Sequence, residues 1–262
     1  MPRFAANLSM LFTELPFLDR FEAAASAGFN GVEFLFPYDY EADDLAARLK
    51  ANGLKQVLFN LPAGNWTAGE RGIAIYPNTI DEFRNSVASA IRYAKVLGCT
   101  HLHCLAGTAP ATADHRAMRK TYVDNLRFAA RALADAGLTL LIEAINTRDV
   151  PTYFLDTTAK AADIIESVGA PNLKLQYDIY HMQIMEGDLA PTISKYLRHI
   201  AHVQIADTPG RHEPGTGEIN FPFLFDHLDH VGYEGWIGCE YKPHTSTYDS
   251  LAWFRALKSN PD

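Results

Sequence analysis

LTLLIE, at residues 138–143, is the first of four short apolar runs that each close on an oxygen-bearing side chain. The other three are LKLQYD at 173–178, IAHVQ at 200–204 and WIGCE at 236–240. Each run has the length and apolar content of a buried β-strand. Glu143, Asp178, Gln204 and Glu240 therefore stand at the ends of four successive predicted strands.

Four earlier runs complete a set of eight predicted strands, around Phe4–Leu8, Val32–Phe36, Gln56–Phe59 and His101–Leu105. Amphipathic segments of helical period separate the strands, for example PFLDRFEAAASAGF at 16–29. A glycine follows the helical segment and precedes the strand at six places, where a left-handed helix cap is expected: Gly28, Gly53, Gly98, Gly137, Gly169 and Gly232.

Eight alternating strands and helices in 262 residues predict one (β/α)₈ TIM barrel over residues 1–262. No Pro/Gly/Ser-rich linker divides the chain, and no GxGxxG follows the first strand as an open dinucleotide-binding sheet would require.

Composition narrows the classes of partner. The net charge of −8 and the lack of a dense Lys/Arg run disfavour nucleic acid and favour a small substrate. No apolar stretch is long enough for a bilayer, and the start lacks a secretory h-region, so a cytoplasmic protein without membrane contact is expected. Cys99, Cys104 and Cys239 are predicted to be small buried hydrophobes without chemistry.

The strand-end residues indicate a hard-metal site at the barrel mouth. A buried carboxylate needs a cation or hydrogen-bond donors, and a salt bridge at the rim would satisfy Glu143 or Glu240 taken singly. Four oxygen donors on neighbouring strands favour a divalent ion instead, Mg²⁺ before Mn²⁺, bound by Glu143, Asp178, Gln204 and Glu240.

Other polar residues are expected on the same face. His103 ends the fourth strand and His181 follows Asp178 by three residues, and both are predicted to hydrogen-bond substrate oxygens. The long segments 60–80 and 206–220 are predicted loops over the mouth and carry Arg71 and Arg211. Glu33, on the second strand, either approaches the pocket from the barrel interior or orients a loop.

Several longer motifs closely resemble the hydroxypyruvate isomerase family, within the xylose isomerase-like TIM barrels. They are FAANLSMLFTELPFLDRF, GVEFLFPYDY, NLPAGNWTAGERGIA, QYDIYHMQIMEGDL, HVQIADTPGRHEPGTGEIN and GWIGCEYKP. The resemblance runs from about Arg3 to Trp253. The 2-oxotetronate isomerases share FAANLSM and GWIGCEYKP, whereas GNWTAGERGIA and YDIYHMQIMEG look more like hydroxypyruvate isomerase.

The resemblance implies an enzyme that interconverts hydroxypyruvate and tartronate semialdehyde (2-hydroxy-3-oxopropanoate), a reaction of glyoxylate metabolism. It implies that Glu143 and Glu240 are the catalytic acids, that both are metal ligands, and that Asp178 and Gln204 complete the metal shell. Gln204 departs from the related ketose 3-epimerases, which have His there. Their substrate-binding His and Arg correspond to His181 and Arg211.

The implied reaction transfers a proton between neighbouring carbons through an enediolate, with Glu240 expected as base and Glu143 as acid. A hydride shift would use the same ligands. Because the substrate is anionic, Arg211, Arg71 and Lys242 are the candidates to hold its carboxylate, and Arg211 is favoured for its bidentate geometry.

Four alternatives stay open at this stage. The nearest is a 2-oxotetronate isomerase, and the next is another small sugar-acid isomerase or epimerase. More remote are a barrel nuclease like endonuclease IV and an inactive sugar-acid sensor. A homo-oligomer is also expected, because related isomerases often assemble.

Overall fold

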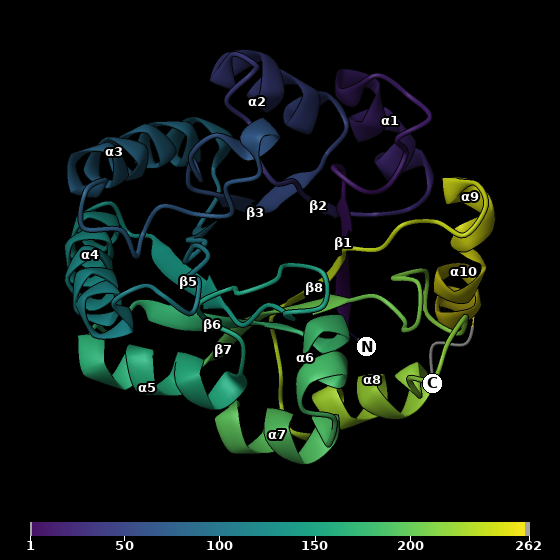
Figure 1. Ribbon diagram of the computed structural model, residues 1–262. Helices are drawn as coiled ribbons and strands as arrows, with labels where there is room; N and C mark the ends of the chain where they lie inside the picture. Colours follow the sequence, from purple (N-terminus) through teal and green to yellow (C-terminus); the bar gives the residue numbers. More distant parts are fainter. Residues whose placement is uncertain (1, 260–262) are drawn as a thin grey trace.

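Eight parallel strands close into a barrel in the computed structural model, which describes residues 2–259 (Figure 1). Every strand pairs with its neighbours in chain order, and β8 pairs with β1. The strands are β1 (Arg3–Asn7), β2 (Gly31–Glu33), β3 (Lys55–Asn60), β4 (His101–His103), β5 (Thr139–Glu143), β6 (Leu173–Asp178), β7 (Ile200–Ile205) and β8 (Trp236–Cys239). The predicted (β/α)₈ barrel is confirmed, and each predicted strand is present.

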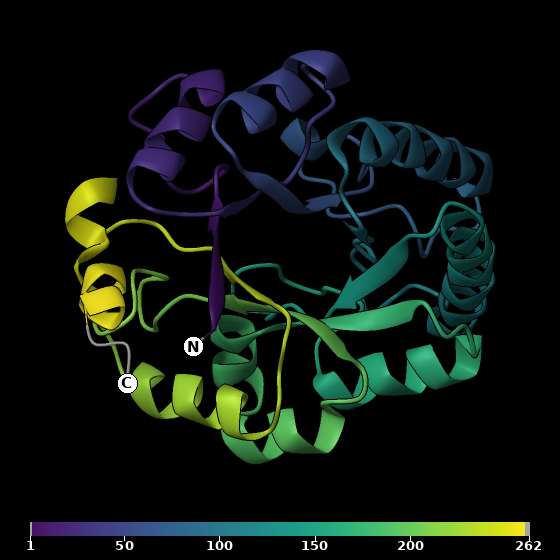
Figure 2. The ribbon, with the colours of Figure 1, turned by 180° about the vertical axis from the view of Figure 1, so that it is seen from behind.

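The helices form a ring outside the barrel, which Figure 2 shows from behind. They are α1 (Arg20–Ser26), α2 (Ala42–Ala51), α3 (Ile80–Leu97), α4 (His115–Asp135), α5 (Thr158–Val168), α6 (Ile179–Met185), α7 (Leu189–Tyr196), α8 (Phe221–His230), α9 (Thr247–Ser250) and α10 (Ala252–Ser259), with 3₁₀ turns η1 (Phe17–Asp19) and η2 (Trp66–Ala68). None of those described is long and apolar enough to span a bilayer.

All six predicted cap glycines have positive φ: Gly28, Gly53, Gly98, Gly137, Gly169 and Gly232. Glycine enters this left-handed region without a steric penalty, so each helix can stop and turn back toward the next strand. The backbone conformation of these glycines is therefore consistent with the alternation of helices and strands that the sequence predicted.

Strand β2 ends earlier than the apolar run around it suggests. The pairing register with β3 shifts between Val32 and Glu33, and the backbone N–H of Leu35 donates to the hydroxyl of Ser9. Beyond Glu33 the chain keeps two backbone hydrogen bonds with β3, from Phe34 N–H to the Leu58 carbonyl and from Asn60 N–H to the Leu35 carbonyl, before it enters the loop.

The main core lies between the strands and the helix ring. A second, smaller cluster of Ala5, Val57, Leu58 and Leu141 lies apart from it, with Trp236 packed against its edge. Cys99, Cys104 and Cys239 are free and buried, as expected.

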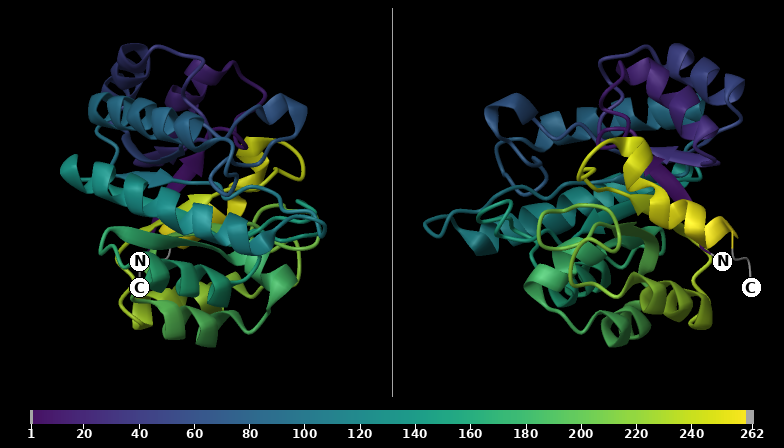
Figure 3. Two further views of the ribbon diagram at one scale, coloured as in Figure 1. Left: turned by 60° about the vertical axis from the view of Figure 1, so that its left-hand side comes forward. Right: turned by 90° about the vertical axis from the view of Figure 1, so that its right-hand side faces the viewer.

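Long loops gather at one end of the barrel, beyond the carboxyl ends of the strands (Figure 3). The loop after β7 is organised by Asp207, which is fully buried. Its carboxylate accepts backbone N–H groups from Thr208, Gly215, Gly217 and Ile219 at 2.9–3.1 Å. Four such bonds from one side chain fix the path of the loop that carries Arg211.

Candidate active site

A cavity of about 600 Å³ opens at the barrel mouth and collects the predicted site. It is lined by eight of the nine predicted residues: Arg71, His103, Glu143, His181, Gln204, Arg211, Glu240 and Lys242. Asp178, the ninth, is 1% exposed and lies 3.6 Å from the His181 ring and 3.7 Å from the Arg211 guanidinium. Residues from four strands, the helix α6 and three loops are thereby brought into one place.

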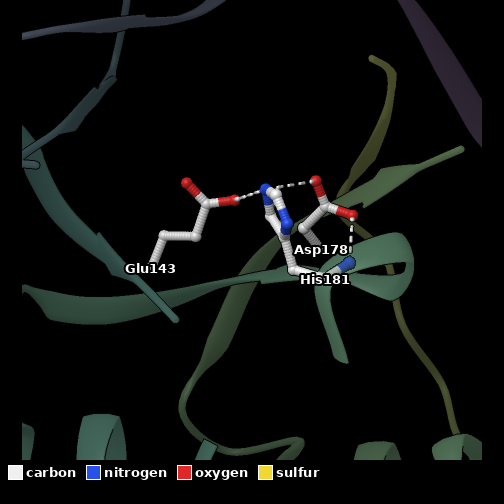
Figure 4. Close-up of side chains that lie close together, drawn as sticks. All are labelled: Glu143, Asp178 and His181. Atoms are coloured by element: carbon white, nitrogen blue, oxygen red, sulfur yellow. Dashed lines mark hydrogen bonds and ion pairs between the residues drawn. The ribbon is translucent and has the colours of Figure 1, made fainter. Parts of the chain in front are cut away.

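Glu143, Asp178 and His181 form the tightest group. One nitrogen or carboxylate oxygen from each lies within 4.8 Å of the others, and all three side chains are buried. Figure 4 shows the imidazole of His181 between the two carboxyl groups. Its Nε2 is 3.6 Å from Asp178 Oδ2 and 4.0 Å from Glu143 Oε1.

Asp178 also starts α6. Its Oδ1 accepts the backbone N–H groups of Tyr180 at 2.8 Å and His181 at 3.3 Å, as an N-cap side chain does. Its Oδ2 has no hydrogen-bond partner among the described residues, although it is buried. A buried carboxylate oxygen without a donor fits a cation ligand.

Glu240 meets the guanidinium of Arg211 rather than the His181 group. Arg211 Nη2 donates to Glu240 Oε1 at 2.9 Å, and the guanidinium lies 5.1 Å from the centre of the Tyr180 ring. Arg211 has φ of 59°, a left-handed conformation that costs a non-glycine residue about 1–2 kcal/mol. The loop anchored by Asp207 holds Arg211 in that conformation, so the fold itself fixes the position of the Arg211 backbone.

The charges in this group do not balance. Glu143, Asp178 and Glu240 are three buried carboxyls, and the guanidinium of Arg211 contacts two of them, Asp178 and Glu240. Burial first, and then repulsion from Asp178 and Glu240, raises the pKa of Glu143 well above its usual range. Burial also raises the pKa of Asp178, and it raises that of Glu240 to about 8 although Arg211 opposes this. The full set of carboxylates calls for two more positive charges, which a divalent ion would supply.

Gln204 is held from two sides. Its Nε2 donates to Glu33 Oε1 at 2.7 Å, and its Oε1 accepts from Gln176 Nε2 at 2.6 Å. Because the Glu33 carboxylate accepts, it keeps the amide nitrogen of Gln204 toward itself and leaves the oxygen as the acceptor. An amide oxygen has a second lone pair available to a metal ion.

The sequence left two roles open for Glu33, and the structure places its side chain in the barrel interior. It is fully buried and does not line the cavity. Besides Gln204, its carboxylate contacts the amide nitrogen of Asn7 at 3.0 Å and Nε2 of His202 at 2.7 Å. Glu33 thus orients the side chain of Gln204 from inside the barrel, without lining the cavity itself.

His103 lies on the other side of Glu143. Its Nε2 is 3.5 Å from Glu143 Oε2, and its Nδ1 is 3.1 Å from the side-chain oxygen of Asn60. Burial, and then His202, lowers the pKa of His103 to about 3. Burial, and then Arg211, lowers the pKa of His181 well below its usual range. Both rings are therefore neutral at pH 7.

Arg71 and Lys242 occupy the rim of the cavity. The Arg71 guanidinium stacks on the Trp66 ring, 4.0 Å from its centre, and donates to the backbone oxygens of Trp66 and Glu70. The backbone N–H of Lys242 donates to the carbonyl of Arg211 at 2.7 Å. Arg71 is thus partly engaged by its own loop.

Sequence reasoning missed several polar residues of the site: Asn7, Asn60, Asn146, Gln176 and Tyr180. One signal was available, because Gln176 precedes Asp178 by two residues and so shares its face of β6. Asn146 lies three residues past Glu143, in the loop after β5. The two-residue periodicity of a strand does not apply there, so the sequence does not predict where its side chain points.

Comparison with known proteins identifies the family of this chain. A family model described as a xylose isomerase-like TIM barrel matches residues 21–257. The chain is 53% identical to a 2-oxo-tetronate isomerase of Cupriavidus necator, covering 97% of this chain and 98% of that protein. It is also 53% identical to a hydroxypyruvate isomerase of Escherichia coli, again covering 97% and 98%.

A solved structure described as an AP endonuclease, family 2, from Brucella melitensis is 50% identical, with a TM-score of 0.96 over 98% of this chain and 99% of that one. The closed barrel and these matches agree on the fold. This chain belongs to the xylose isomerase-like TIM-barrel family.

Proposed function

We propose that this protein is an isomerase that interconverts hydroxypyruvate and tartronate semialdehyde. One observation carries the proposal: Glu143 and Glu240 face one cavity from β5 and from the end of β8, with Asp178 and Arg211 between them. Two carboxyls beside one bound substrate can remove and return a proton. The relatives named hydroxypyruvate isomerase and 2-oxo-tetronate isomerase support the reaction class.

Glu143, Asp178, Gln204 and Glu240 would hold a divalent ion, Mg²⁺ by preference and Mn²⁺ as the second choice. The charge deficit of the three carboxyls and the unpartnered Asp178 Oδ2 support this shell. When bound, the ion would polarise the substrate carbonyl and stabilise negative charge on its oxygen.

Glu240 is the proposed base and Glu143 the proposed acid. Burial raises the pKa of both carboxyls, but Arg211 contacts Glu240 and opposes the shift there, whereas Asp178 and Glu240 add to the shift at Glu143. Glu240 is therefore the group that ionises more readily. Glu240 takes the proton from carbon 3 of hydroxypyruvate, leaving an enediolate. Glu143 then gives a proton to carbon 2, and the hydroxyl proton on carbon 3 moves to the oxygen on carbon 2. Proton exchange with solvent returns Glu240 to its carboxylate and Glu143 to its acid form.

Arg211 is the proposed holder of the substrate carboxylate, with Lys242 and Arg71 at the rim as helpers. Its Nη2 is used by Glu240, but its Nε has no hydrogen-bond partner among the described residues. The Nε edge is therefore the donor available to an anion. The neutral rings of His103 and His181 would hydrogen-bond the other substrate oxygens.

The decisive experiment is an isomerase assay with hydroxypyruvate on purified protein, before and after EDTA and after return of Mg²⁺ or Mn²⁺. We expect activity that EDTA removes and the metal restores, and loss of at least about 10³-fold in kcat in Glu143→Gln and Glu240→Gln. Full activity without metal would exclude the metal part. Solvent deuterium in the product would favour the enediolate over a hydride shift.

A 2-oxotetronate is the second candidate substrate. The identity to a 2-oxo-tetronate isomerase equals that to a hydroxypyruvate isomerase, and a cavity of about 600 Å³ has room for one more carbon. The ratio of kcat/KM for the two acids decides between them, and the same assay extends to other small sugar acids. A sensor without turnover would bind these acids and convert none.

A nuclease is disfavoured for this chain. The net charge is −8, and the sequence has no dense Lys/Arg run of the kind that follows a phosphate backbone. Incision of a duplex carrying an abasic site, at a rate that Glu143→Gln abolishes, would reverse this judgement. A cytoplasmic location and a homo-oligomer also stay proposals, and size-exclusion chromatography with light scattering would test the latter.

A further inference from the structure

The amide of Asn146 makes contacts that fix its orientation. Asn146 is fully buried, and its Oδ1 accepts the backbone N–H of Asp149 at 2.7 Å. Its Nδ2 lies 3.1 Å from Asp149 Oδ2 and 2.6 Å from Nδ1 of His181. A backbone N–H can only donate, so the atom facing it is the amide oxygen. The nitrogen of Asn146 therefore faces His181.

This orientation sets the tautomer of the imidazole. The two N–H bonds of the Asn146 amide point to Asp149 and to His181 Nδ1, so Nδ1 presents a lone pair. A neutral ring with a bare Nδ1 carries its hydrogen on Nε2. That Nε2 is the atom between the carboxyls of Glu143 and Asp178 (Figure 4).

A second contact reinforces the first. The hydroxyl of Tyr180 donates to the same Asp149 Oδ2 at 2.8 Å. Asp149 is thereby pinned by two donors and by its own N–H, and it cannot turn away from Asn146. The resulting chain, Tyr180 to Asp149 to Asn146 to His181, is called here the amide clasp.

We propose that the amide clasp makes His181 a hydrogen-bond donor and excludes it from the metal shell. A metal-binding histidine uses a lone pair on the nitrogen that faces the ion and donates from its other nitrogen, usually to a carboxylate or carbonyl. His181 has the opposite arrangement. Its Nε2–H, which lies between the carboxyls of Glu143 and Asp178, would donate to the oxygen of a bound substrate that gains charge in the reaction, a role that rests on the proposed isomerase function.

Asn146 is accordingly a positioning residue, and Asn146→Asp is the informative change. The carboxylate keeps the size of the amide but replaces the donor to Nδ1 by an acceptor, which favours hydrogen on Nδ1 and a bare Nε2. Asn52→Asp is the matched control, because Asn52 is a partly exposed residue at the C-cap of α2, away from the site, and takes the same change of atoms.

The first test reads the tautomer directly, on metal-free protein without substrate. Two-bond ¹H–¹⁵N correlations are recorded at pH 7.5 on histidine-labelled protein, and the His181 peaks are assigned by their absence in His181→Ala. We expect the Nε2–H form in the wild type and in Asn52→Asp, and the Nδ1–H form in Asn146→Asp. An Nδ1–H or doubly protonated ring in the wild type would overturn the proposal, as would an unchanged tautomer in Asn146→Asp.

The second test separates donor from ligand. By calorimetry, His181→Ala should change the Kd for Mn²⁺ by less than about threefold, and Asp178→Asn should raise it more than about tenfold. A comparable loss in His181→Ala would place His181 in the shell and refute the proposal. Circular dichroism confirms that each variant is folded.

Kinetics supply the third readout. Asn146→Asp should lower kcat by about 10²-fold, the loss typical of one misdirected donor, and change KM by less than about threefold. A KM effect alone would contradict the assignment. The tautomer and the Mn²⁺ affinity are both measured without turnover. A failed isomerase assay would therefore refute the proposed function, whereas the amide clasp is tested by the tautomer and the affinity alone.

Discussion

The buried carboxyls predict an unusual pH dependence of stability for the metal-free protein. The folded-state pKa of Glu240 is raised to about 8 from a usual value of 4.5, chiefly by burial. Between these two values the folded chain binds a proton that the unfolded chain has lost. Stability from this group is therefore complete below pH 4.5 and disappears as the pH rises through 8.

The size of the effect follows from those two values. Proton binding by Glu240 contributes about 1.4 kcal/mol at pH 7 and about 0.4 kcal/mol at pH 8. The wild type should thus lose about 1 kcal/mol more than Glu240→Gln over this interval. Buried histidines, with lowered pKa, and buried cysteines, with raised pKa, also titrate, but their contributions are common to both proteins and cancel in the comparison.

The assay is urea unfolding at pH 7.0 and 8.0 in EDTA, followed by circular dichroism, for the wild type and Glu240→Gln. A repeat with Mg²⁺ should stabilise the wild type more at pH 8 than at pH 7, since protons compete with the ion for the same oxygens. If the two proteins change in parallel between pH 7 and 8, Glu240 is ionised in the folded state and the charge-deficit reasoning is wrong.

Three further predictions concern Arg211 and two residues, Gly238 and Asp207, that position the site. Arg211→Lys should raise KM for hydroxypyruvate by about tenfold or more, because an ammonium cannot replace the two-pronged donor; an unchanged KM removes Arg211 from carboxylate binding. Gly238→Ala should cost about 1–3 kcal/mol by urea unfolding, because its Cβ would lie 2.5 Å from the carboxyl carbon of Glu33; full stability would mean that Glu33 can move freely. Asp207→Asn should cost about 1–3 kcal/mol and make the loop after β7 sensitive to trypsin at Arg211, since an amide cannot accept all four N–H bonds; unaltered proteolysis would show another anchor.

The fold could be predicted from short stretches of sequence because two independent patterns, apolar runs and cap glycines, indicated the same strands and helices. Each strand is an apolar run, and positive-φ glycines mark the helix ends at Gly28, Gly53, Gly98, Gly137, Gly169 and Gly232. The residues at strand ends were equally accessible, because in a parallel barrel the carboxyl ends of all strands meet at one face. Glu143, Gln204 and Glu240 line the cavity for that reason.

Contacts that cross the barrel could not be predicted in the same way. His202 of β7, for example, contacts Glu33 of β2 across 169 positions of sequence, and no local pattern around either residue indicates this pairing. Asn146 lies in a loop, and its effect on His181 depends on a backbone N–H whose direction only the folded chain defines. Such details depend on side-chain rotamers and on loop conformation, which hydrophobic periodicity does not encode.

The bond from Glu33 to Gln204 has a consequence for how activity arises during folding. It joins β2 to β7, two strands that are not neighbours in the sheet, across the interior and over 171 positions of sequence. A fragment that contained β5 to β8 would hold all three carboxyls but would lack the partner that orients the Gln204 amide. If the proposed ion binds, its affinity should therefore depend on closure of the whole barrel, and two separately expressed halves should bind it tightly only on reassembly.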